Sequence, residues 1–188
     1  FGITTVDART VISPEFKAAG HKLYLVKHTP KADYTPDCEA LRRNFTLVTD
    51  LIEKGSVVAA YAVGFGGVAE AVSKMAFGNK IGVELSDKVT NDLLFYAPMG
   101  SIVIETECDI DGGIVIGQTV KDSKLSACGV EISMDEAVSA WTNTLEKIYP
   151  TTAGEFTTEP ETYSYNNRNI IVAGEKFAKP RIFIPVFP

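Results

Sequence analysis

The hydrophobic pattern is clearest in a central stretch of the chain, where three elements are expected in succession. Residues 57 to 63 are small and β-branched, which predicts a buried strand. Gly64 to Gly67 then interrupts the run with glycines, which tolerate the positive φ of a tight turn. Apolar residues recur at helical spacing until Gly78-Asn79, a common helix end, and residues 81 to 85 begin another strand. This order predicts a compact β-α-β unit whose helix starts at a glycine turn.

Two amphipathic helices are expected outside this unit. The first begins at Asp37 as N-cap and ends near Lys54, and the second begins at a Ser133–Glu136 capping box and ends near Tyr149. The period of 3.6 residues assigns their buried faces, which are Leu41, Phe45, Val48 and Ile52 in the first helix and Ala137, Trp141, Leu145 and Ile148 in the second.

The remaining segments are expected to be strands and turns. A strand is predicted over residues 23 to 26, an irregular segment over 87 to 98, and a short strand over 127 to 132. Residues 101 to 107 and 114 to 120 are predicted to pair as a hairpin around a turn. Strands and helices in this order place the chain in the α/β (α+β) class.

Composition is that of an ordinary globular protein with one sizeable core. The chain has 188 residues, of which 45% are hydrophobic and 22% are charged. Its net charge of −6 argues against nucleic acid as a partner, and no apolar run approaches about 20 residues, so no membrane contact is expected. Three widely spaced cysteines (Cys38, Cys108, Cys128) and the absence of a signal-peptide pattern favour a reduced, cytoplasmic compartment.

The glycine turn is the main candidate for binding chemistry. A helix N-terminus offers N–H groups and partial positive charge, so Gly64, Gly66 and Gly67 are candidate contacts to a nucleotide or substrate phosphate. Glu70 and Lys74 follow as a favourable i,i+4 pair. The alternative is that the glycines only let the helix pack closely on its parent strand. The sequence contains neither GxGxxG nor GxxxxGK[ST].

Other polar residues point less clearly to chemistry. Asp109 and Asp111 could hold Mg²⁺ through carboxylate oxygens, although Asp-x-Asp-Gly is also a common turn sequence. His21 and His28 flank one short strand and are expected to be partly exposed. No catalytic constellation is found, since HExxH, GxSxG and CxxC are all absent.

The end of the chain changes character. Residues 151 to 165 are rich in Thr, Glu, Pro and Tyr without a period, which is typical of a linker. Residues 181 to 187 then form an apolar strand pattern, and a domain rarely ends on an unpaired hydrophobic strand. Together with a start at Phe1 instead of Met, this indicates a piece of a longer protein.

The order of several segments resembles the aminoimidazole-ribonucleotide-synthetase-type C-terminal domain of phosphoribosylformylglycinamidine synthases. The resemblance covers about residues 13 to 188. Its most specific part is the end, which looks like the first strand of the glutaminase domain in the large, single-chain form. The segments are Gly66–Val72, Lys74–Gly78, Ile81–Val83, Leu93–Ile104, Val138–Tyr149 and Arg181–Pro188.

The resemblance implies a fold and a reaction. The family fold is a three-layer α/β/α sandwich around a mixed sheet, here over residues 1–150, with a linker over 151–180 and a truncated glutaminase strand over 181–188. The parent enzyme uses ATP and Mg²⁺ to activate the amide of formylglycinamide ribonucleotide, and ammonia from glutamine then yields formylglycinamidine ribonucleotide. This chain would be the C-terminal member of the second repeat, with the N-terminal and glutaminase domains of the same polypeptide as partners, and inactive alone.

One departure from the family affects the glycine turn. The common family pattern His-Asp-x-Ser-Asp-Gly-Gly is replaced here by Tyr61-Ala62-Val63-Gly64-Phe65-Gly66-Gly67, which keeps only the glycine pair. The chain thus retains backbone amides but not the side chains that could bind metal or transfer protons. Two alternatives therefore stay open: a non-catalytic structural module, or a domain of a related ATP-using enzyme of the selenophosphate synthetase or thiamine-phosphate kinase type.

Overall fold

The structure is a computed structural model that describes residues 5–96, 99–152, 161–164, 166, 174, 178–179, 181 and 183–185. The chain divides into two units, Phe1–Thr151 and Thr152–Pro188, and the helices and strands given below all lie in the first. The predicted linker and the predicted glutaminase strand lie largely outside the described residues and stay predictions.

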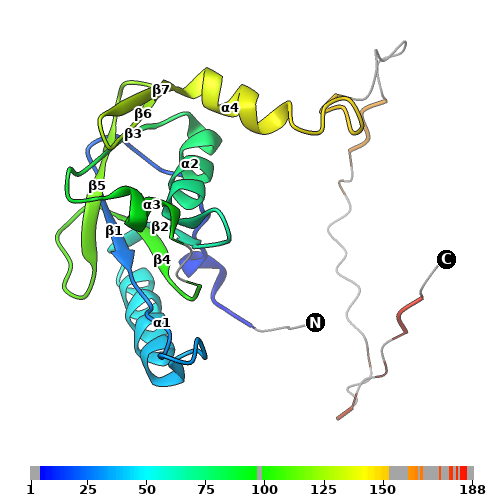
Figure 1. The fold of residues 1–188 in the computed structure, drawn as a ribbon. Helices are drawn as coiled ribbons and strands as arrows, with labels where there is room; N and C mark the ends of the chain where they lie inside the picture. Colours follow the sequence, from blue (N-terminus) through cyan, green and yellow to red (C-terminus); the bar gives the residue numbers. More distant parts are fainter. Residues whose placement is uncertain are drawn as a thin grey trace. The chain divides into compact units, whose positions relative to one another are not determined.

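Seven strands of the described residues form one mixed sheet in the order β2-β4-β1-β5-β3-β6-β7 (Figure 1). Neighbouring strands pair antiparallel, except that β3 and β6 are parallel. The strands are β1 (Lys22–Val26), β2 (Val57–Ala62), β3 (Gly82–Leu85), β4 (Ile102–Thr106), β5 (Ile114–Val120), β6 (Lys124–Ala127) and β7 (Val130–Ser133).

Helices pack on both faces of this sheet, which gives three layers. Alternate residues of β1 show the two faces, since Leu23 and Leu25 join a core with α2 and α3, whereas Tyr24 and Val26 join a second core with α1. The fold is therefore the predicted α/β sandwich around a mixed sheet. The helices are η1 (Ala8–Thr10), α1 (Cys38–Glu53), α2 (Gly67–Asn79), α3 (Asn91–Phe95) and α4 (Met134–Thr142).

The predicted β-α-β unit forms, but it is not compact. Its two strands, β2 and β3, are parallel and are separated by β4, β1 and β5. The helix between them ends at Asn79, as predicted, and its C-cap is Lys80, which adopts the left-handed conformation with φ 53°. The central strands β1 and β4 are buried on both sides along most of their length, which suits them to the middle of the sheet.

The predicted hairpin of residues 101–107 and 114–120 is wrong, because β1 lies between β4 and β5 and pairs with both. A hairpin forms instead between β6 and β7, and it covers residues 124–133, where only one short strand over 127–132 is predicted. Its two-residue turn is Cys128-Gly129, with φ values of 52° and 78°, which matches the positive φ values of a tight hairpin turn. The segment predicted to be irregular contains α3, which Thr90 caps through the N–H of Leu93.

The structure agrees more closely with the first predicted amphipathic helix than with the second. Asp37 caps α1 by accepting from the N–H groups of Glu39 and Ala40, as predicted, although Phe45 on the expected buried face is half exposed. Ser133 caps α4 through the N–H of Glu136, also as predicted. However, α4 ends at Thr142 instead of near Tyr149, and its expected buried face is exposed at Trp141 (55%), Leu145 (55%) and Ile148 (71%).

Among the helices that the structure describes, none has the length and apolarity needed to cross a membrane.

Candidate functional site

The glycine turn connects β2 to α2 and is fixed by backbone bonds. The N–H of Val63 donates to the carbonyl of Ser101 at 2.9 Å, and the N–H of Gly67 donates to the carbonyl of Gly64 at 3.1 Å. Gly67 is buried with φ 71°, a conformation that favours glycine. A side chain there would also place its Cβ only 2.7 Å from the carbonyl oxygen of Leu94. Gly67 is thus required for the close packing of α2 against α3.

Gly66 is bonded to a carboxylate of the same chain. Its N–H donates to Glu70 Oε2 at 2.8 Å, and Glu70 Oε1 accepts from Lys74 Nζ at 2.5 Å. The Lys74 ammonium and then the Gly66 N–H hold the pKa of Glu70 below its usual value, and Glu70 in turn raises the pKa of Lys74. The predicted i,i+4 pair is therefore present, and it also satisfies one of the free N–H groups at the helix N-terminus.

This carboxylate stands where an incoming anion would bind. A Cβ on Gly66 would lie 2.6 Å from the Cβ of Glu70, so the glycine also makes room for the approach of Glu70. A phosphate could accept from the Gly66 N–H only after Glu70 had left it. A nucleotide phosphate, such as that of the ATP that the family resemblance implies, would therefore compete with Glu70 for this N–H, and the predicted phosphate contact stays a prediction. The sequence signal for this contact is an acidic residue four positions after the glycine.

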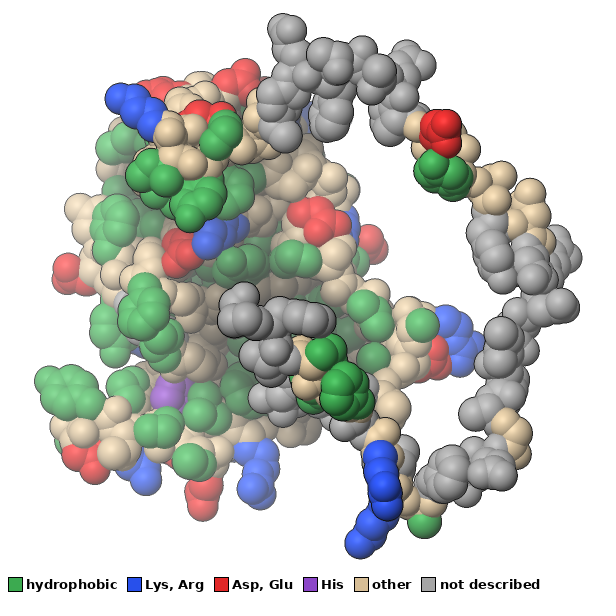
Figure 2. All heavy atoms as spheres, turned by 90° about the vertical axis from the view of Figure 1, so that its right-hand side faces the viewer, with side chains coloured by type: hydrophobic (Ala, Val, Ile, Leu, Met, Phe, Trp, Pro, Cys, Tyr) green, Lys and Arg blue, Asp and Glu red, His purple; other side chains and the backbone are tan. Residues whose placement is uncertain are grey.

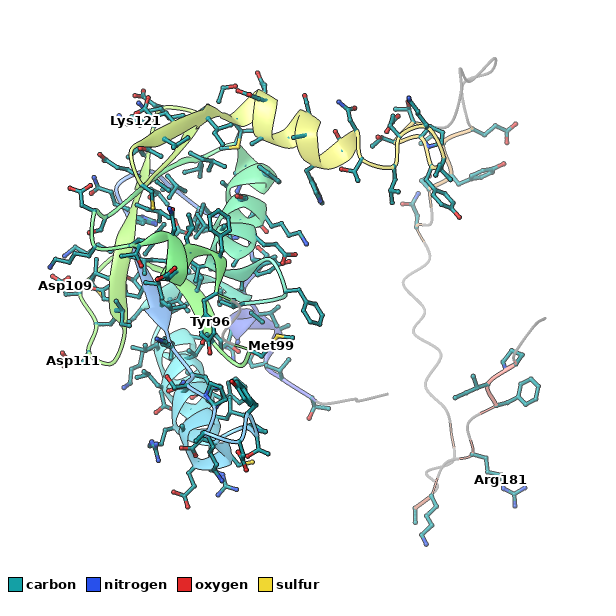
Figure 3. All side chains as sticks on the ribbon, in the orientation of Figure 1. Tyr96, Met99, Asp109, Asp111, Lys121 and Arg181 are labelled. Carbon is teal, nitrogen blue, oxygen red and sulfur yellow. The ribbon has the colours of Figure 1, made fainter. Side chains whose placement is uncertain are left out.

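The side chains around the turn are apolar and exposed. Phe65 at the tip is 89% exposed, and Phe95, Tyr96 and Met99 at the end of α3 are also exposed. Figure 3 shows Tyr96 and Met99 in the segment that follows α3. Lys27 Nζ lies 6.0 Å from the centre of the Tyr96 ring. A surface of this kind suits contact with another protein surface better than proton transfer.

The acidic loop lies between β4 and β5, where Asp109 and Asp111 extend outward (Figure 3). Asp109 accepts from Lys22 Nζ and, at 3.0 Å, from the hydroxyl of Tyr24. Lys22 and Tyr24 lower the pKa of the Asp109 carboxyl. Within the described part of the chain, no three or more His, Cys, Asp or Glu side chains form a group that could hold a metal ion. Among the described residues no third ligand of these types joins the predicted Mg²⁺ pair, and the site stays a prediction.

His28 is buried, which corrects the expectation of a partly exposed strand-end residue. Its Nδ1 lies 2.8 Å from the carbonyl of Met99, and its Nε2 accepts from the N–H of Asp37 at 3.2 Å. The Nδ1 atom must therefore carry the proton, and the ring is neutral in this arrangement. His28 fastens the start of α1 to the segment after α3.

Glu105, the fourth residue of β4, is a fully buried carboxylate that the sequence-based predictions do not include. It accepts from the N–H groups of Lys17 (2.9 Å) and Ala18 (3.4 Å), and lies 2.8 Å from His21 Nδ1. Since a buried carboxylate is costly unless it is bonded, these contacts explain how it is accommodated. They hold the segment before β1 against the sheet. No local pattern marks this residue, because its partners are distant in sequence.

An apolar hollow of about 330 Å³ lies between α2, α3 and the β6–β7 hairpin. It is lined mainly by hydrophobic side chains such as Val72, Leu94, Phe95, Leu125 and Val130. It therefore offers shape and apolar contact more than catalytic groups.

Comparison with known proteins supports the fold. No protein-family model matches the sequence. The PurLQS structure from Thermotoga maritima matches with a TM-score of 0.60 and 12% identity, over 84% of this chain and 31% of that chain. Phosphoribosylformylglycinamidine synthase II from T. maritima gives 0.59 and 12% over the same shares. T. maritima PurL complexed with ATP gives 0.56 and 11%, over 70% of this chain and 28% of that chain.

The chain thus spans about a third of the length of the chains it matches. At these identities the likeness concerns the fold, and it covers most of this chain. The chain has the AIR-synthase-like fold seen in the PurL structures.

Proposed function

We propose that this chain is the C-terminal domain of the second repeat in a large, single-chain phosphoribosylformylglycinamidine synthase. Such a ligase uses ATP, Mg²⁺ and glutamine to convert formylglycinamide ribonucleotide into formylglycinamidine ribonucleotide in purine biosynthesis. The observation that carries this proposal is the match of 84% of the chain to the fold of that synthase. T. maritima PurL has also been solved with ATP and with FGAR, the ligands that this activity requires.

Within the parent enzyme, the domain acts as a scaffold. Two contacts support this role over a phosphate site at the glycine turn. Gly67 packs against the backbone of α3, and Glu70 occupies the N–H of Gly66. Contact of Gly64, Gly66 and Gly67 with a phosphate stays a prediction, and it requires Glu70 to move away from Gly66. We assign no catalytic residue to the domain.

The partners proposed for the domain belong to the same polypeptide. They are an AIR-synthetase-type N-terminal domain, which would complete the ATP and ribonucleotide site, and a glutaminase domain, which would supply ammonia. The parent enzyme would be cytoplasmic. Because its fold spans about a third of the synthase chains it matches, the isolated chain is expected to have no ligase activity.

The experiment uses the full-length protein encoded by the native gene. Purified protein is incubated with formylglycinamide ribonucleotide, glutamine and Mg·ATP, and formation of formylglycinamidine ribonucleotide is followed together with ADP release. Glutamine-dependent product formation is expected. A well-folded parent protein without this activity would overturn the proposal. ATP-dependent turnover of selenide or of thiamine phosphate would instead identify one of the related synthetases.

A further inference from the structure

The segment Ala137–Tyr149 presents an apolar surface that the described residues leave uncovered. Its large side chains follow the spacing of one helix face, at positions i, i+4 and i+7 for Trp141, Leu145 and Ile148. All three side chains are more than half exposed, and so is Tyr149. In a globular domain this spacing normally marks the face that packs on a core.

The surface begins at the core of the domain and continues away from it. The ring of Trp141 stacks on Phe77 of α2, with centroids 5.4 Å apart and planes at 29°. Helix α4 extends outward from the sheet (Figure 1), and the apolar segment continues after the helix through Tyr149. Figure 2 views the molecule from the right-hand side of Figure 1, the side toward which α4 extends, and shows hydrophobic side chains among charged ones on that surface.

The helix stops before its apolar pattern does. The continuous α-helix ends at Thr142, whereas the apolar pattern continues through Leu145 and Ile148. The following residues form turns, in which the N–H of Ile148 donates to the carbonyl of Leu145 at 2.9 Å. Short helical segments gain most of their stability from packing, so an end without a packing surface tends to fray into turns. A covering surface would favour continuation of the helix.

We propose that Ala137–Tyr149 is a docking helix that packs its apolar face into an apolar groove of another domain of the same polypeptide. Docking extends α4 through Tyr149 and removes Trp141, Leu145 and Ile148 from water. The inference rests on the proposed function for the existence of that domain. The chains that share this fold support it, because about two thirds of their length lies beyond the part matched by this chain.

The contact resembles the binding of an amphipathic helix in a groove, with anchors at i, i+4 and i+7. Large aromatic and aliphatic anchors of this kind carry most of the binding energy in protein interfaces. The polar positions of the same segment, such as Ser139, would stay at the solvent side.

The test is hydrogen exchange of residues 143–149 in the full-length protein and in the 188-residue chain, without substrates. Backbone amides in this segment are expected to exchange at least about tenfold more slowly in the full-length protein. The double variant Leu145→Asp/Ile148→Asp should abolish this protection, and Ser139→Asp serves as the matched control that leaves it unchanged. The double variant should leave the thermal midpoint of the 188-residue chain within about 1 °C.

Three results would overturn the proposal. Equal exchange in the two proteins would mean that no other domain covers the segment. A large loss of stability in the 188-residue double variant would mean that this chain covers its own apolar face. A dimer of the 188-residue chain that the double variant dissociates would make a second copy the occupant. Because the readout needs no turnover, a failure of the proposed ligase activity would be seen separately.

Discussion

Helices α2 and α4 differ in how much of their apolar face is buried by the rest of this chain. At the start of α2, the Glu70 carboxylate accepts from the N–H of the N-cap residue Gly66. Five hydrophobic side chains of α2 are buried in the core, namely Val68, Ala71, Val72, Met75 and Ala76. In α4 only Met134 is fully buried, and Val138 packs partly buried against the same core, whereas Trp141 and the apolar positions after the helix are more than half exposed. Both helices have a clear apolar face in the sequence. The period of a helix identifies the face that will be covered, but not which part of a protein covers it.

The largest expected effect comes from truncating one apolar side chain in α2 and one in the segment that follows α4. Met75→Ala removes a fully buried side chain from α2 and should lower the free energy of unfolding by about 3 kcal/mol. Leu145→Ala removes a half-exposed side chain after α4 and should change it by less than about 0.5 kcal/mol in the 188-residue chain. Urea unfolding followed by circular dichroism measures both values. Equal losses would remove the distinction between the two helices.

A smaller effect is expected at the start of α2. Gly67→Ala introduces a Cβ at φ 71° and 2.7 Å from the Leu94 carbonyl, and should cost about 2–3 kcal/mol. Gly129→Ala is the matched control, because Gly129 has φ 78° but open space around the added Cβ. Its cost should be only the backbone strain of about 1 kcal/mol. If the two variants lose the same stability in urea unfolding, the packing role of Gly67 is wrong.

The smallest effect is expected for the carboxylate at the turn. Because Lys74 and the Gly66 N–H lower its pKa in the folded state, the charged form of Glu70 stabilises the fold above its unfolded pKa of about 4.3. This contribution is lost as pH falls through the lowered folded pKa. Glu70→Gln should therefore cost about 1 kcal/mol at pH 7 and progressively less as pH falls through the lowered folded pKa. A difference in unfolding free energy that stays constant from pH 7 to pH 3 would contradict the contact.

Local signals in the sequence predicted the elements better than their arrangement. The cap residues Asp37 and Ser133 fix two helix starts, since capping depends only on neighbours along the chain. Because β4 and β5 are neighbours along the chain, the sequence predicts a hairpin between them. In the structure β1 lies between them, and this position depends on which strands are buried on both faces.

In the candidate site, too, the sequence predicts local contacts but not contacts between residues that are distant along the chain. The glycine turn and the Glu70–Lys74 pair are visible in the sequence because they are local. The contact of Gly67 with α3 and the bonding of Glu105 to the segment before β1 join residues that are distant in sequence. No pattern of spacing reveals such contacts. The predicted phosphate contact at the glycine turn stays a prediction, and the structure adds the Glu70 carboxylate that a phosphate would have to displace from the Gly66 N–H.

The central claim is that Glu70 holds the Gly66 N–H at the start of α2 more strongly than a free phosphate group can in the 188-residue chain. It is tested by titrating the ¹⁵N-labelled 188-residue chain with Mg·ATP and, separately, with inorganic phosphate, while the amide signals of Gly64, Gly66 and Gly67 are followed. The account predicts no saturable shift of these signals up to millimolar ligand. Saturable shifts of all three at submillimolar concentration would contradict it, and would show that Glu70 gives way to a phosphate.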